Sequence, residues 1–195
     1  GVYLPYREKG YDTPETYNKK LIKDKTAEGG RDDIGFLNGI LYKAEIETYV
    51  PQKESLKEIY EEYTKAILEG KVLEKREKLI SFQDINKISV IVSDVTEAQA
   101  GDIVIFEREE KKKDGKNVSK KFENKKVGII VEDIESKAEE YGTNQKELLG
   151  EIKVVWMNEE KGAEETKLSE IWKREEGYEV PRCVEIRRIL KKGNS

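Results

Sequence analysis

The stretch AGDIVIF, residues 100–106, and the stretch KKVGIIV, residues 125–131, decide the fold class of this chain. Both are short runs of β-branched residues bounded by glycine, aspartate or charged residues, which is typical of strands. Three more runs share this character: KISVIVSDV at 87–95, GEIKVVWMN at 150–158 and PRCVEIRRIL at 181–190. We therefore expect these runs to form one antiparallel sheet in the second half of the chain.

The first half of the chain has helical periodicity instead. Residues 12–25 open with Asp-Thr-Pro, where Thr13 or Asp12 can cap a helix and proline suits its first position, so we expect a helix to about residue 23. Residues 33–45 carry apolar side chains at spacings of three and four, which predicts a second helix. Helices followed by an antiparallel sheet define an α+β fold.

Two glycines, Gly35 and Gly39, fall within the second predicted helix. Each costs up to about 1 kcal/mol there relative to alanine, so we expect close packing at these positions. Residues 53–80 form a further helical region with an apolar stripe, made of Leu56, Ile59, Tyr60, Tyr63, Ile67 and Leu68. The stripe predicts packing either on its own domain or on a partner.

Composition excludes several classes of function. The 37 basic and 41 acidic residues are interleaved and leave a net charge of −4, which argues against nucleic-acid binding. The chain has no histidine, so imidazole catalysis and histidine metal sites are impossible. Its single cysteine, Cys183, excludes an internal disulfide and is predicted to be a buried thiol.

Membrane, metal and cofactor sites are also not indicated. The sequence has no run of about 18 apolar residues and no signal-peptide pattern, so no transmembrane segment is expected. Acid-rich stretches such as NEEKGAEE at 158–165 lack the alternating ligands of a calcium loop and are predicted to be solvated faces. We expect no metal and no cofactor.

Five motifs, in this order, resemble the NlpC-type cell-wall cysteine peptidases, a branch of the papain-like fold. They are LPY at 4–6, DDIGF at 32–36, AGDIVIF at 100–106, KKVGIIV at 125–131 and VEIRRIL at 184–190. Family members carry a PY segment, DCSGF opening a helix, GDLVFF, HVGIY and a strand ending near RRV. The resemblance implies one papain-like domain over 1–195, with N-terminal helices packed on a central antiparallel sheet, a helical insertion at about 51–80 and a charged loop or hairpin insertion at about 107–125.

The resemblance also locates the positions of the catalytic groups. The nucleophile position falls on Asp33, the histidine position on Lys126 and the orienting position near Trp156, while Tyr6 matches the family's PY tyrosine. All three catalytic positions differ from the family pattern. The resemblance therefore implies a catalytically inactive, extracytoplasmic member whose groove, lined by Tyr6, Asp33, Lys126 and Trp156, binds a peptidoglycan stem peptide or a protein partner. Tyr6 is equally compatible with a place in the core, and a tryptophan at a strand end, such as Trp156, is more typical of the core than of a ligand site.

One hypothesis and two alternative functions stay open at this stage. Asp33 and Lys126 place an anion and a cation where the family has a thiolate and an imidazolium, so we expect an ion pair; the simpler interpretation of Asp33 is a helix cap. A hydrolase that uses the carboxylates of Asp32, Asp33 and Asp102 is one alternative. A scaffold protein that uses the charged helical insertion is the other.

Overall fold

The computed structural model describes residues 4–26, 28–46, 50, 53–73, 76–107, 109–110, 125–141, 144–173, 178–179 and 184–190. The chain divides into two compact units. We call residues 1–89, 157–163 and 190–195 the helical unit, and residues 90–156 and 164–189 the sheet unit. Most of the predicted charged insertion, together with Cys183, lies outside the described residues.

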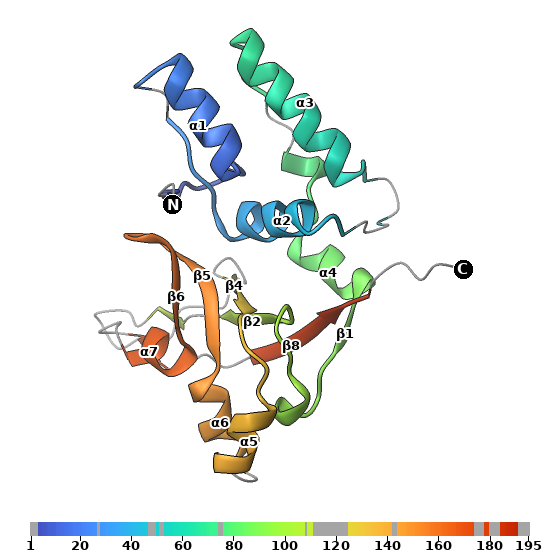
Figure 1. Cartoon of the computed structure of the whole chain (residues 1–195), viewed down its shortest axis with the longest axis vertical. Coiled ribbons are helices and arrows are strands. Elements are labelled where there is room, and N and C mark those ends of the chain that lie inside the picture. The colour runs from blue at the N-terminus through green and yellow to red at the C-terminus, as the bar shows by residue number, and fades with distance from the viewer. Residues whose placement is uncertain are drawn as a thin grey trace. The chain divides into compact units, whose positions relative to one another are not determined.

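Four helices form most of the helical unit (Figure 1). They are α1 (Pro14–Lys23), α2 (Asp33–Lys43), α3 (Leu56–Glu69) and α4 (Phe82–Ile88), with a short 3₁₀ turn at Arg76–Lys78. Capping boxes begin α1 at Thr13 and α3 at Ser55, as the sequence chemistry requires. Gly70 ends α3 with a φ of 73°, a left-handed conformation that glycine adopts without strain. The helical region predicted at 53–80 is therefore helical in α3 and only briefly thereafter.

The apolar stripe of α3 is buried within the helical unit, where α3 packs beside α1 and α2. Its members are between 0% and 7% exposed, except Leu68, which is 63% exposed. The stripe therefore supplies core contacts to its own unit and is not an open docking face. On α2, the buried Asn38 amide donates to the carbonyl of Ile80 and accepts from the Ile80 amide, which fixes the segment leading to α4.

A six-stranded sheet has the strand order β1-β8-β2-β4-β5-β6. Its strands are β1 (Ser89–Ile91), β2 (Ile103–Glu107), β4 (Lys125–Ile130), β5 (Lys153–Asn158), β6 (Gly162–Lys167) and β8 (Val184–Ile189). Antiparallel pairing joins β2 to both β4 and β8, and β4 to β5. A separate two-stranded ribbon pairs β3 (Glu109–Glu110) with β7 (Tyr178–Glu179). The predicted α+β class is confirmed.

One face of the sheet carries the core of the sheet unit. Alternate residues such as Val104, Phe106 and Val154 pack with apolar residues from the three helices α5 (Glu135–Tyr141), α6 (Gln145–Glu151) and α7 (Leu168–Lys173) and from the 3₁₀ turn at Val95–Glu97. The helices α5 and α6 lie beside each other, and α6 contacts α7 (Figure 1). The sheet is therefore covered on this face by short helices.

The sequence prediction missed several elements of the sheet unit. The helices α5, α6 and α7 are only six or seven residues long, too short for a clear helical period. Strand β6 lies partly in the acid-rich stretch that we predicted to be a solvated face. Glu159, Glu160 and Glu165 are exposed as predicted, whereas Gly162 and the following Thr166 are buried, so one side of the strand packs inward.

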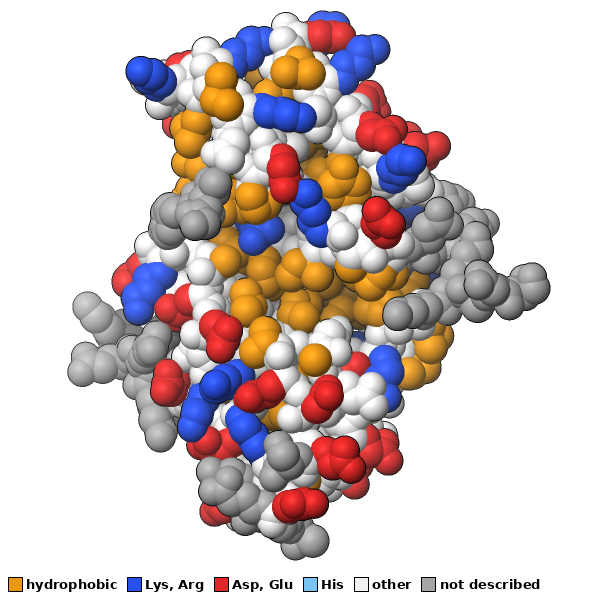
Figure 2. Space-filling model, in the orientation of Figure 1, with side chains coloured by type: hydrophobic (Ala, Val, Ile, Leu, Met, Phe, Trp, Pro, Cys, Tyr) orange, Lys and Arg blue, Asp and Glu red, His pale blue; other side chains and the backbone are white. Residues whose placement is uncertain are grey.

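Charges of both signs are interspersed on the face of the molecule seen in Figure 2, and no large area of one sign stands out there. This distribution matches the interleaving of basic and acidic residues along the sequence. Within the described part of the chain, every helix is too short or too polar to cross a bilayer.

Candidate functional site

Two of the four residues that the resemblance singled out, Tyr6 and Asp33, lie in the helical unit. Tyr6 forms an isolated parallel bridge with Arg31, and Asp33 is the first residue of α2, where it is 5% exposed. The N-cap of α2 is Asp32, whose carboxylate accepts from the Gly35 amide at 3.0 Å and from the Lys9 amide at 3.0 Å. The interpretation of Asp33 as the cap was therefore wrong by one residue.

The other two residues, Lys126 and Trp156, lie on one face of the sheet. Lys126 pairs with Phe106 across β2 and β4, and Trp156 pairs with Gly128 across β4 and β5. Because directly opposed residues share a face, Lys126 and Trp156 are diagonal neighbours on the side of the apolar core. Both are buried, at 5% and 2% exposure. Asp33 and Lys126 belong to different units, and their ion pair stays a prediction.

The contacts of Asp102 argue against the alternative function, a hydrolase that uses carboxylates. Arg188 donates from Nε to Asp102 Oδ1 at 2.9 Å and from Nη2 to Oδ2 at 2.8 Å. The Gln99 amide also donates to Oδ2, at 2.9 Å, so Asp102 bonds its own turn as its Gly-Asp sequence predicts. The paired carboxylate raises the pKa of Arg188. Both Asp102, in the sheet unit, and Asp32, in the helical unit, thus have structural roles.

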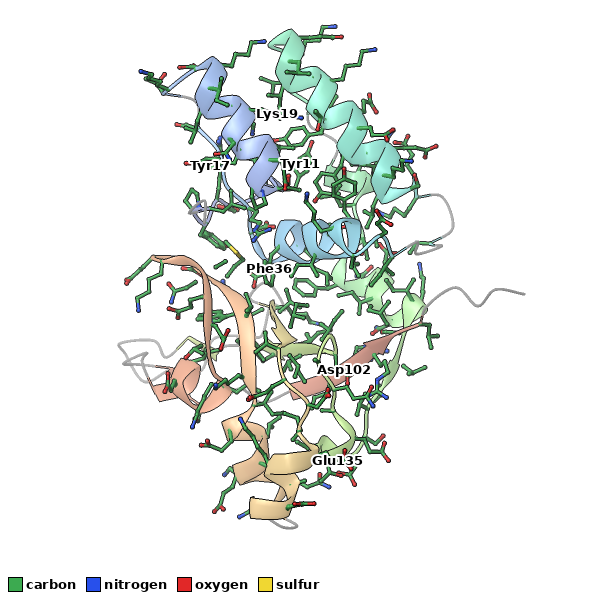
Figure 3. The ribbon with its side chains drawn as sticks, in the orientation of Figure 1. Tyr11, Tyr17, Lys19, Phe36, Asp102 and Glu135 are labelled. Carbon is green, nitrogen blue, oxygen red and sulfur yellow. The ribbon has the colours of Figure 1, made fainter. Side chains whose placement is uncertain are left out.

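A pocket of about 860 Å³ opens in the helical unit. The segment Arg7–Asp12, helix α1 and the C-terminal half of α3 with the following Gly70–Leu73 form its walls. Tyr11 lies between α1 and α3 (Figure 3), and its ring is 4.3 Å from that of Tyr63. The charged lining residues have both signs: Arg7, Lys9, Lys20, Lys23 and Lys71 are basic, and Glu8, Asp12, Asp24, Glu28 and Glu77 are acidic.

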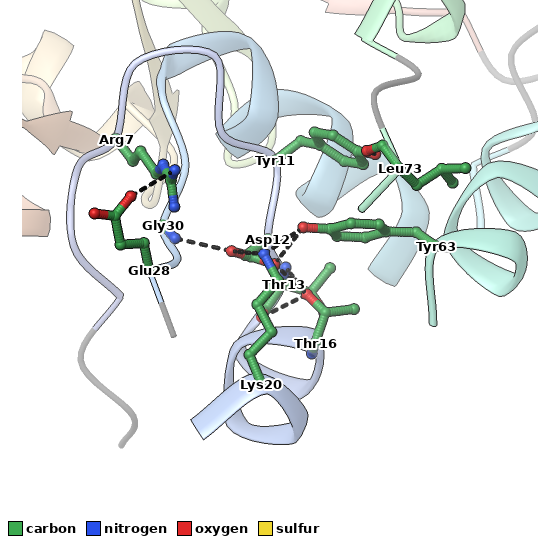
Figure 4. Close-up of polar contacts among 10 residues, drawn as sticks. All are labelled: Arg7, Tyr11, Asp12, Thr13, Thr16, Lys20, Glu28, Gly30, Tyr63 and Leu73. Carbon is green, nitrogen blue, oxygen red and sulfur yellow. Dashed lines mark hydrogen bonds and ion pairs between the residues drawn. The ribbon is translucent and has the colours of Figure 1, made fainter. Parts of the chain in front are cut away.

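Asp12 organises the wall of this pocket (Figure 4). Its carboxylate is 1% exposed and accepts four hydrogen bonds. The donors are Thr16 Oγ1 at 3.1 Å, the Tyr63 hydroxyl at 2.8 Å, Lys20 Nζ at 2.9 Å and the Gly30 amide at 2.8 Å. The Asp12 carboxylate therefore joins α1, α3 and the turn before α2 at one point.

Electrostatics of the wall favour binding over acid-base chemistry. Burial raises the pKa of the Tyr63 hydroxyl, and the adjoining Asp12 carboxylate raises it further. Tyr63 therefore stays protonated at neutral pH and serves as a donor to Asp12. Lys20 Nζ lies between Asp12 Oδ2 and the Tyr63 oxygen, to which it donates at 2.6 Å, so the basic charge is matched by a buried acid. A buried network in which each polar group has a hydrogen-bond partner keeps the side chains of the pocket wall in fixed positions.

The sequence prediction did not single out this pocket. Asp12 was considered only as a cap for α1, but Thr13 is the cap, and this leaves the Asp12 side chain to face Tyr63. The signal present in the sequence was Tyr63 on the apolar stripe of α3, because a buried tyrosine hydroxyl requires a polar partner. The partner is 51 residues away along the chain, and only the tertiary structure identifies it.

Comparisons with known proteins identify no relative of this chain. No protein-family model matches the chain, and no curated protein or solved structure matches it significantly. Among the described residues, no group of three or more acidic or cysteine side chains is placed to hold a metal ion.

Proposed function

We propose that this chain is a non-catalytic, NlpC-type papain-like module that binds a peptide, the stem peptide of peptidoglycan, in the pocket of the helical unit. The observation that carries the proposal is the pocket of about 860 Å³ with an aromatic wall and charges of both signs. The order of helices followed by an antiparallel sheet agrees with the fold that the motifs imply.

The chemistry of the pocket favours a short peptide. Sites for small ligands have volumes of roughly 300 to 1,000 Å³, and this pocket lies within that range. A peptide carries an ammonium, carboxylates and backbone amides, which match a wall with both basic and acidic side chains. The rings of Tyr11 and Tyr63 add apolar area next to polar hydroxyls. A polyanion would instead require a basic surface.

The chain lacks the groups that the family uses for hydrolysis. It has no histidine, and Asp33 and Lys126 occupy the positions of the nucleophile and the histidine in the resemblance. The carboxylate of Asp12, which faces the pocket, already accepts four hydrogen bonds and is not available to abstract a proton. Binding without cleavage is therefore the expected behaviour.

Binding of soluble stem peptides and of purified peptidoglycan by the full chain tests the proposal, with the same samples examined for cleavage products. Lys9→Glu reverses one charge at the pocket, and no described side-chain contact of Lys9 is lost. Lys57→Glu on α3 is the matched control, since Lys57 is exposed and, among the described residues, pairs only with Glu61, at 4.0 Å. We expect Lys9→Glu to weaken peptide binding about tenfold and Lys57→Glu to leave it unchanged.

Other outcomes contradict the proposal in distinct ways. Binding that is weakened by Asp33→Ala or Lys126→Ala, but not by Lys9→Glu, would move the ligand to the residues of the resemblance. Cleavage that disappears in Asp33→Ala would identify a hydrolase based on carboxylates. Absence of any binding to stem peptides would reject the peptide-binding role.

A further inference from the structure

Three aliphatic side chains at one end of the helical unit are largely exposed. Val72 is 90% exposed, Ile22 85% and Leu68 63%, the largest fractions among the large apolar side chains that the structure describes. Ile22 lies in the last turn of α1 and Leu68 in the last turn of α3, while Val72 follows shortly after α3 ends. Exposed apolar side chains that gather at one place mark a contact surface, whereas scattered ones do not.

The C-terminal ends of α1 and α3 lie side by side. Lys20 on α1 donates to the Tyr63 hydroxyl on α3. One turn later along both helices, Lys23 Nζ donates to the carbonyl oxygen of Ile67 at 3.1 Å, so α1 and α3 run in the same direction (Figure 1). The turn at Gly70 lies at the same place, because a β-carbon there would be 3.3 Å from Lys23 Nζ. The three exposed side chains therefore share one end of the helical unit.

We call residues 19–26 and 65–72 the tip. These two segments contain six lysines and two acidic residues, a formal charge of +4 in a chain whose net charge is −4. Both acids are engaged within the tip: Glu69 pairs with Lys71 at 2.6 Å, and the Asp24 carboxylate accepts two hydrogen bonds from the residue two positions on. Figure 2 shows hydrophobic and basic side chains next to one another over the ends of α1 and α3. The tip is therefore a local basic surface on a chain that is acidic elsewhere.

Each helix places a lysine beside its exposed apolar side chain. Lys19 precedes Ile22 by three residues, and Lys65 precedes Leu68 by the same interval. Residues at this spacing share a helix face. The stem of a lysine can lie along apolar surface while its ammonium reaches a charged layer. Lys20 differs, because a buried carboxylate already matches its charge, which reduces the excess at the tip to +3.

The composition of the tip favours a lipid surface over a protein partner. All of its basic residues are lysines, and it contains no arginine and no aromatic residue. Protein interfaces are instead enriched in arginine and aromatic residues and depleted of lysine. A second copy of the chain is also disfavoured, because a symmetric contact would bring two basic tips together. Lysines around aliphatic side chains match the anionic headgroups and the acyl chains of a bilayer.

We propose that the tip docks this protein on the surface of a bilayer that contains anionic lipids. The side chains of Ile22, Leu68 and Val72 enter the boundary between headgroups and acyl chains, and the lysines of the tip contact the anionic headgroups. Both contributions act at the same place, so loss of either one weakens docking. Docking is also sensitive to salt, because ions screen the attraction between exposed charges.

This docking surface is distinct from the proposed peptide site, although the two adjoin each other. Lys71 and Val72 of the tip also line the pocket, whereas Ile22, Leu68 and Lys65 do not. Substitutions at these last three positions therefore change docking and leave the pocket lining intact. The inference uses the exposure and charge of the tip and does not rest on peptide binding.

Sedimentation of the full chain with lipid vesicles tests the proposal. One set of vesicles contains equimolar phosphatidylglycerol and phosphatidylcholine, and the other contains phosphatidylcholine alone. We expect the chain to sediment with the anionic vesicles at low salt, and binding to weaken at high salt or with neutral vesicles. Ile22→Gln and Leu68→Gln should each weaken binding to anionic vesicles about tenfold. Lys65→Glu should weaken it by about the same factor.

Two substitutions outside the tip are matched controls. Ile91→Gln replaces an isoleucine on β1 that is 57% exposed, and Lys57→Glu reverses an exposed charge near the start of α3, at the opposite end of that helix from Lys65. Both variants should bind anionic vesicles like the wild type. Because Ile22 is exposed, Ile22→Gln should keep the melting temperature of the wild type and its affinity for stem peptides.

Four results would overturn the inference. The first is that the chain does not sediment with anionic vesicles, and the second is equal binding to anionic and neutral vesicles. The third is that Ile91→Gln weakens binding as much as Ile22→Gln does. The fourth is a dimer in the absence of lipid that Ile22→Gln dissociates, which would assign the tip to a second copy. Vesicle binding by a chain that binds no stem peptide would support the docking surface and reject only the peptide-binding role.

Discussion

The hydroxyl of Tyr63 donates to the carboxylate of Asp12 at 2.8 Å, which ties the middle of α3 to the segment before α1. Replacement of Tyr63 by phenylalanine removes this donor and leaves the buried carboxylate with three. We expect a loss of about 2 kcal/mol in the free energy of unfolding, because hydrogen bonds to charged acceptors contribute roughly that much. Denaturation by urea measures it.

Tyr17→Phe is the matched control for this change. Tyr17 lies on α1 (Figure 3), is only partly buried, and its hydroxyl makes no hydrogen bond with the residues that the structure describes. Its replacement should change the free energy of unfolding by less than about 0.5 kcal/mol. Equal losses in the two variants would contradict the role of the Asp12–Tyr63 bond.

Alkaline pH should unfold the helical unit through its buried tyrosines. Burial raises the pKa of both Tyr60 and Tyr63 above the ordinary value of about 10. The folded state therefore keeps these protons where the unfolded state releases them. The associated stability is complete below about pH 10 and is lost as the pH rises further.

Absorbance of tyrosinate measures this effect. Tyr60 and Tyr63 should ionise only together with loss of helical circular dichroism. In Tyr63→Phe, one fewer tyrosine should titrate in that late step. Reversible ionisation of all tyrosines below pH 10.5 with the helical signal intact would refute the prediction.

Replacement of Gly35 or Gly39 in α2 by alanine should change the stability of the protein in opposite directions. A β-carbon on Gly35 would lie 2.2 Å from the Gly10 carbonyl oxygen and 2.7 Å from the Tyr11 Cα, which are backbone atoms and cannot move aside cheaply. We expect Gly35→Ala to cost about 3 kcal/mol or more in the free energy of unfolding.

Gly39→Ala has no such clash and should gain up to about 1 kcal/mol from helix propensity. Thermal unfolding of the two variants under the same conditions compares them directly. Similar melting temperatures for Gly35→Ala and the wild type would show that the Gly10 backbone does not lie against α2 at Gly35.

In the sheet unit, Asp102→Asn should destabilise β2 against β8. Arg188 on β8 forms two hydrogen bonds to the carboxylate, which is 3% exposed. An asparagine has one acceptor oxygen in place of two, so we expect a loss of about 2 kcal/mol. Hydrogen exchange should accelerate at the β2 and β8 amides.

An exposed ion pair serves as the control for this prediction. Arg7 and Glu28 are 43% and 82% exposed, so Glu28→Gln should cost less than about 0.5 kcal/mol. If Glu28→Gln and Asp102→Asn had the same effect on stability, burial of the Asp102 carboxylate would not govern its contribution.

The sequence by itself determined much of the backbone. Asp-Thr-Pro predicted the start of α1, because a threonine side chain accepts from the first free amide groups and proline lacks one. Gly70 ends α3 in a left-handed conformation, which is typical of a glycine that follows a helix. Alternating β-branched runs predicted β2, β4 and β5, and all three pair in the antiparallel sheet. These signals are local, so one segment suffices to reveal each of them.

Only the tertiary structure decided how the side chains are used. Asp12 and Asp32 look alike in sequence, each a carboxylate before a helix, yet Asp32 caps α2 while Asp12 gathers donors from α1, α3 and the Gly30 turn. Sequence patterns also gave no sign that Arg31 and Tyr60 lie near Gly39, because this proximity depends on the packing of α3 against α2. Hydrogen bonds and charges act across a few ångströms of space, whereas sequence patterns report only the neighbours along the chain.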